Sequence, residues 1–152
     1  MHAPLVVVRL FLGVSEALEA KLKHLEFIQA VISRLAANSF LFKGWAITIA
    51  AGLSAFATVD NTRGLLAISL ISTVMFWALD GYYLWLERCF RRLYQRVAMK
   101  NDADIDFIME PEKPNPMKQW LRTCLSRPHL WIFYGSIILV EFFGILVMRV
   151  KR

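Results

Sequence analysis

The sequence predicts an all-α integral membrane protein with three spanning helices, because it combines three long apolar stretches with an apolar composition. The stretches are 40–59, 64–86 and 130–148, and each is close to the roughly 20 apolar residues that a spanning helix needs. Hydrophobic residues make up 57% of the chain's 152 residues, whereas a soluble domain usually has about 45–50%. We therefore expect residues 1–152 to form a single membrane domain.

An amphipathic helix is expected before the first span, at residues 15–35. Ser15 suits its N-cap, and Glu16 and Glu19 suit the positive end of the helix dipole. Its apolar residues recur every three or four positions, at Leu18, Leu22, Leu25, Ile28, Ile32 and Leu35. This stripe has two interpretations. The helix lies along the membrane or against the bundle, or it forms a self-association seam with Gln29 at a polar core position.

The stretches 40–59 and 64–86 are predicted to form a transmembrane hairpin, because the polar sequence Asp-Asn-Thr-Arg-Gly at 60–64 suits a tight turn between them. Small residues recur every four positions along the first span, at Ala46, Ala50 and Ser54. Small side chains let helix backbones approach one another closely in lipid. We expect this face to pack against other helices and to join copies of the chain in a homo-oligomer.

Residues 87–129 are predicted to form a cytoplasmic segment that begins with a basic amphipathic helix. The charged face of that helix carries Arg88, Arg91, Arg92, Arg96 and Lys100. Three prolines between 111 and 116 then indicate a semi-rigid linker, and a short amphipathic helix is expected at 117–126. Because these bases flank apolar spans, we expect them to bind anionic lipid headgroups or a soluble protein partner. We do not expect direct nucleic-acid binding, although the net charge is +6.

The distribution of Lys and Arg predicts the orientation of the spans. Residues 87–129 carry nine of these bases, residues 1–43 carry five, and the turn at 60–64 carries one. Because cytoplasmic loops are enriched in positive charge, we expect a multi-pass protein whose N-terminus and 87–129 segment are cytoplasmic. The block 130–148 has a length that fits a third crossing. Its alternative is to lie in the membrane without crossing, since crossing would place three terminal bases outside.

Ionisable and polar residues inside the apolar stretches are the sharpest candidates for a functional site. A charge within the membrane is costly and normally faces a partner or water. Asp80 shares one face of its helix with Ser69 and Thr73, and Glu141 lies well inside the last block. Each carboxylate is either structural, bonded to a neighbouring helix, or part of an acidic lining of an aqueous path. Lys43 is expected to extend to the membrane interface.

Sites for enzymatic chemistry or for a cofactor are not expected. The sequence has no phosphate-binding loop, no arrangement that suggests a catalytic triad, and no zinc-ligand spacing. Its three histidines are scattered in flanking segments, and its two cysteines lie in the segment predicted to be cytoplasmic. We therefore predict no catalytic residue, no metal site and no cofactor.

Two sequence runs carry a resemblance to a class of bacterial membrane proteins. They are HLEFIQ at 24–29 with NSFLFKGW at 38–45, and DGYYLWLER at 80–88 with FRRLY at 90–94. Together they resemble small two-transmembrane effectors of anti-phage defence operons. The resemblance implies an oligomeric inner-membrane effector or pore-forming subunit, triggered by a cytoplasmic partner from the same operon. The alternative is a membrane scaffold that anchors a soluble complex and conducts nothing.

Overall fold

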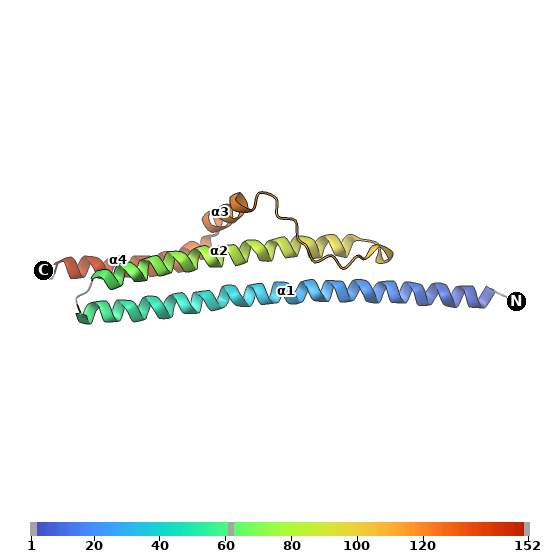
Figure 1. The fold of residues 1–152 in the computed structure, drawn as a ribbon, viewed down its shortest axis with the longest axis horizontal. Coiled ribbons are helices and arrows are strands. Elements are labelled where there is room, and N and C mark those ends of the chain that lie inside the picture. Colours follow the sequence, from blue (N-terminus) through green and yellow to red (C-terminus); the bar gives the residue numbers. More distant parts are fainter. Residues whose placement is uncertain (1–2, 61–62, 151–152) are drawn as a thin grey trace. The chain divides into compact units, whose positions relative to one another are not determined.

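The computed structural model describes residues 3–60 and 63–150, and all of its regular structure there is helical (Figure 1). The four α-helices are α1 (Ala3–Asp60), α2 (Arg63–Met99), α3 (Pro116–Ser126) and α4 (Pro128–Val150), with a 3-10 turn η1 (Asp102–Asp104) after α2. Three of these helices contain segments long and apolar enough to cross a membrane, within Gly13–Ala57, Gly64–Met99 and Pro128–Leu146. The all-α prediction with three helices of spanning length is confirmed.

Helix α1 differs from the expected arrangement, because the helices predicted at 15–35 and 40–59 are one uninterrupted helix. The intervening residues Ala36, Ala37, Asn38 and Ser39 include no proline, so nothing removes a backbone hydrogen bond there. Of the turn predicted at 60–64, residues 61 and 62 lie outside the described residues, whereas Asp60 ends α1 and Arg63 and Gly64 begin α2. The short helix expected at 117–126 is confirmed as α3, and Pro116 occupies its first turn, where a missing N–H costs nothing.

The chain divides into two compact units, and α1 and α2 each pass through both. The first unit comprises Met1–Arg34 and Leu86–Lys113, and the second comprises Leu35–Trp85 and Pro114–Arg152. Because both helices are continuous, the boundary between the two units falls inside them. No linker segment marks this boundary, so the sequence gives no sign of the division.

The first unit pairs the N-terminal part of α1 with the C-terminal part of α2. Its core contains Ile28, Ile32, Leu93 and Val97, and the segment after α2 packs onto it through Ile105 and Met109. The predicted apolar stripe is therefore buried in its second half. Leu18 and Leu22, in the first half, stay about half exposed, at 45% and 58%.

The segment after α2 is fastened to α1 by one lysine. Lys21 Nζ donates hydrogen bonds to the backbone carbonyl of Lys100 at 2.7 Å and to Asp102 Oδ1 at 2.9 Å. Phe107, whose φ is 53°, covers the buried ring of His24 at a centroid distance of 5.3 Å. These contacts hold residues 100–109 against the helix pair.

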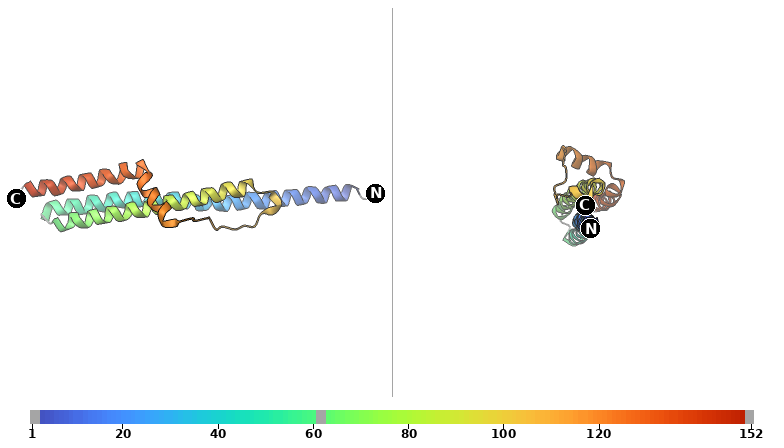
Figure 2. Two further views of the ribbon diagram at one scale, coloured as in Figure 1. Left: turned by 90° about the horizontal axis from the view of Figure 1, so that it is seen from above. Right: turned by 90° about the vertical axis from the view of Figure 1, so that its right-hand side faces the viewer.

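The second unit packs α4 alongside the hairpin of α1 and α2, and α3 crosses α2 obliquely (Figure 2). Its largest core cluster contains Ala46, Phe76, Leu130 and Tyr134, contributed by all three long helices. A second cluster, Ala57 with Leu66, lies toward the end of the hairpin. Many large apolar side chains on the outer faces stay exposed, including Ile71 and Val140, as expected for helices that face lipid.

Candidate functional site

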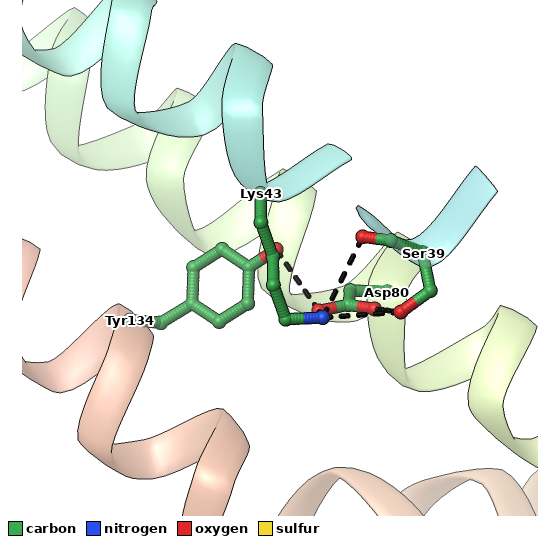
Figure 3. Close-up of polar contacts among 4 residues, drawn as sticks. All are labelled: Ser39, Lys43, Asp80 and Tyr134. Atoms are coloured by element: carbon green, nitrogen blue, oxygen red, sulfur yellow. Dashed lines mark hydrogen bonds and ion pairs between the residues drawn. The ribbon is translucent and has the colours of Figure 1, made fainter. Parts of the chain in front are cut away.

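Asp80 is the centre of a polar cluster that joins the three long helices of the second unit (Figure 3). Its side chain is fully buried. Ser39 of α1 donates a hydrogen bond to Oδ1, and the hydroxyl of Tyr134 in α4 donates to Oδ2 at 3.2 Å. Lys43 Nζ forms an ion pair with Oδ2 at 2.5 Å and also donates to Ser39 Oγ at 3.0 Å. We call these four residues the Asp80 cluster.

The ion pair between Lys43 and Asp80 was not predicted, and the expected extension of Lys43 to the membrane interface stays a prediction. The two partners differ in their access to solvent, since the Lys43 side chain is 23% exposed and that of Asp80 is 0% exposed. A buried charge is tolerated when it is paired and hydrogen-bonded. One signal was available in the sequence: Ser39 and Lys43 lie four residues apart, so they share a helix face.

Glu141 forms a second cluster with two hydroxyl groups of α2. Its side chain is 2% exposed, and its Oε1 accepts hydrogen bonds from Ser69 Oγ and from Thr73 Oγ1, the latter at 3.2 Å. Its other oxygen, Oε2, has no hydrogen-bond partner among the described residues. The predicted polar stripe of α2 is thus divided, since Ser69 and Thr73 bind Glu141 while Asp80 belongs to the other cluster.

A shallow groove lies between α1 and α4 beside Glu141. Its volume is about 230 Å³, and residues that line it include Ala50, Ala51, Ser54, Ser136 and Glu141. We call it the small-residue groove. The face predicted to join copies is occupied in part by the chain itself, because Ala46 is buried in the core and Ala50 is only 6% exposed. Ala50 and Ser54 of that face line the groove, and Ala51 lies beside them.

The basic face of α2 is largely engaged with acids of the first unit. Arg91 pairs with Glu87 and Arg96 with Glu112, both at 2.7 Å, and Lys100 pairs with Asp106 at 2.8 Å. The hydrogen bond from Lys100 holds the pKa of Asp106 below its usual range. Arg92 Nη2 contacts the sulfur of Cys89 at 3.2 Å, and Arg88 is half-buried. Most of these ion pairs are exposed, so each contributes little to stability.

Metal-ligand geometry is not found in the part of the chain that the structure describes, where no three His, Cys, Asp or Glu side chains gather closely enough to hold an ion. Comparisons with known proteins give no matching family model, no matching curated protein and no matching solved structure. The activity must therefore be inferred from the two carboxylate clusters and from the groove beside Glu141.

Proposed function

We propose that the chain is a non-enzymatic, oligomeric pore-forming subunit of the bacterial inner membrane, acting as an effector in anti-phage immunity. The observation that carries this proposal is the carboxylate of Glu141. It lies within an apolar helix, leaves Oε2 without a partner, and lines a groove between two helices of spanning length. A carboxylate in that position is a candidate ligand for cations that cross the bilayer.

Several copies are needed for conduction, because a bundle of three helices encloses little space for water. Acidic side chains contributed by several subunits form the cation-selective rings of known pores. The small side chains of Ala51 and Ser54 border the same groove as Glu141, and they allow the close approach of another helix. A neighbouring copy seated near this groove would bring a second Glu141 toward a shared axis.

We propose that a cytoplasmic protein partner triggers opening of the pore by binding to the first unit. The charge distribution along the chain favours a cytoplasmic N-terminus and a cytoplasmic 87–129 segment. Helices α1 and α2 run without a break from the first unit into the second. A partner that binds the first unit therefore acts on the same two helices that carry Lys43 and Asp80.

A scaffold that anchors a soluble complex and conducts nothing is the second candidate. It is favoured by the hydrogen bonds that both Asp80 and Glu141 make within one copy of the chain. Hydrogen bonds of this kind between helices also serve simply to hold the helices together.

Ion flux through planar bilayers that hold the purified protein separates the two candidates. The pore proposal predicts cation-selective conductance for the wild type, reduced conductance for Glu141→Gln, and a loss of cation selectivity for Glu141→Lys. Ser136→Ala, which changes an exposed hydroxyl in the same groove, is the control and should conduct normally. No conductance from an assembled wild-type protein, or identical selectivity in all forms, would reject the pore and favour the scaffold.

A further inference from the structure

A second groove, apolar throughout, lies between α2 and α3. Its volume is about 470 Å³, and residues that line it include Met75, Ala78, Tyr82, Trp85, Met117 and Trp120. We call it the aromatic groove. Its volume falls within the range of about 300–1,000 Å³ that small-molecule sites occupy. It lies apart from the small-residue groove, which α1 and α4 form.

The position of α3 over α2 is fixed by a close contact and by two indole hydrogen bonds. Gly81 lies so near Cys124 that a Cβ on this glycine would come within 2.3 Å of the sulfur atom. Trp120 Nε1 donates to the carbonyl of Ala78 at 3.1 Å, and Trp85 Nε1 donates to Gln119 Oε1 at 3.3 Å. Both indole N–H groups are therefore used within the protein, and the tryptophans offer ring surface to the groove.

The groove continues onto a helix surface suited to hydrocarbon. Met75 in its wall is 59% exposed, and Ile71, one turn earlier on α2, is 67% exposed. Both residues belong to the apolar segment of α2 that is long enough to span a membrane. Ile71 and Met75 lie one helical turn apart, so they form an exposed apolar surface on α2 that leads to the groove.

The other end of the groove carries positive charge. Pro116 and Met117 line the groove and begin α3, where Asn115 makes no side-chain capping hydrogen bond. Pro116 has no N–H, so the first backbone donor of α3 is that of Met117, and such donors at a helix start, with the helix dipole, attract anions such as phosphate. Lys118, the next residue, is exposed and adds a full positive charge at the same helix end.

We propose that the aromatic groove binds one acyl chain of an anionic phospholipid, whose phosphate lies at the N-terminus of α3 beside Lys118. The apolar walls, the continuity with the surface around Ile71 and the charge at the α3 end together select a lipid with an acidic headgroup. Bound lipid of this kind holds α3 against α2. The inference does not depend on ion conduction, and it holds equally for a pore subunit and for a scaffold.

Native mass spectrometry of the full-length protein, purified in mild detergent and supplied with phosphatidylglycerol or phosphatidylcholine, tests this inference. We expect one retained phosphatidylglycerol per chain, and weaker retention of phosphatidylcholine. Ala78→Phe fills the groove and should abolish retention. Ala67→Phe, at an exposed position of the same helix outside the groove, should leave retention unchanged. Circular dichroism and thermal melting establish that both variants fold.

A matched pair of charge variants tests the headgroup site. Lys118→Gln should weaken phosphatidylglycerol binding about fivefold, the effect of one base near an anionic lipid, and should leave phosphatidylcholine binding unaltered. Arg122→Gln, later in α3 and also exposed, should have little effect. Equal retention by the Ala78→Phe and Ala67→Phe proteins would overturn the proposal. It would also fail if both lipids bind equally, or if Ala78→Phe disrupts oligomers without displacing lipid.

Discussion

Separating Lys43 from Asp80 should destabilise the second unit, by an amount that depends on which partner is removed. Lys43→Met leaves Asp80 without its cationic partner at a site that is 0% exposed, with hydrogen bonds from Ser39 and Tyr134 as its remaining support. Breaking a buried ion pair from one side costs about 3–5 kcal/mol. Because Asp80 has no access to solvent, we expect a cost of about 5 kcal/mol for this variant.

Asp80→Asn should cost less, about 3 kcal/mol, because the Lys43 side chain is already 23% exposed and can turn its ammonium group toward the interface. The neutral amide also keeps an oxygen that can accept from Ser39 or Tyr134. The double variant Lys43→Met with Asp80→Asn removes both charges together. Its cost should therefore be well below the sum of the two single costs.

Unfolding in mixed detergent micelles, followed by tryptophan fluorescence, measures these free energies. The expected order of destabilisation is Lys43→Met, then Asp80→Asn, with the double variant less destabilised than Lys43→Met alone. Lys23→Met, at an exposed position of the first unit, is the matched control and should change stability by less than about 0.5 kcal/mol. Additive costs in the double variant would show that Lys43 and Asp80 are not coupled.

Three further predictions concern helix contact, topology and assembly. Gly81→Ala should destabilise α3 docking by about 1–3 kcal/mol through overpacking, and adding Cys124→Ala should restore stability because it removes the clashing sulfur. Failure of the second change to rescue melting temperature would exclude this contact as the cause. A topology reporter at residue 105 should read cytoplasmic and one at 62 periplasmic, and the reverse labelling would refute the charge-based orientation. Ala51→Leu should fill the small-residue groove and shift the protein to smaller species in light scattering, and unchanged mass would exclude this groove as a contact between copies.

The helices were predictable from sequence because their signals are local. Apolar length indicated the segments of spanning length, and the prolines at 111 and 114 fall in the non-helical stretch between η1 and α3. The continuity of α1 was missed because a change from amphipathic to apolar composition near residue 35 suggested two helices. Composition changes there, but the backbone meets no residue that breaks a helix.

The candidate site was only partly predictable, because its geometry depends on packing between distant segments. The residues Asp80, Glu141, Ser69 and Thr73 stood out as polar groups within apolar stretches. Their partners did not, since helix periodicity fixes which residues share a face but not which face a neighbouring helix presents. Tyr134 was missed for this reason, because a tyrosine near the end of an apolar helix is typical of the membrane interface.

The ion pair between α1 and α2 also limits how often a resting molecule can rearrange spontaneously. Any sliding or rotation of α1 past α2 that separates Lys43 from Asp80 must offset about 3–5 kcal/mol. At equilibrium this cost restricts such states to roughly one molecule in a few hundred to one in a few thousand. A trigger acting through α1 must bind the rearranged state more tightly than the resting state by at least the same factor. In the pore that we propose, this pair would set a threshold that keeps leakage low before a trigger binds.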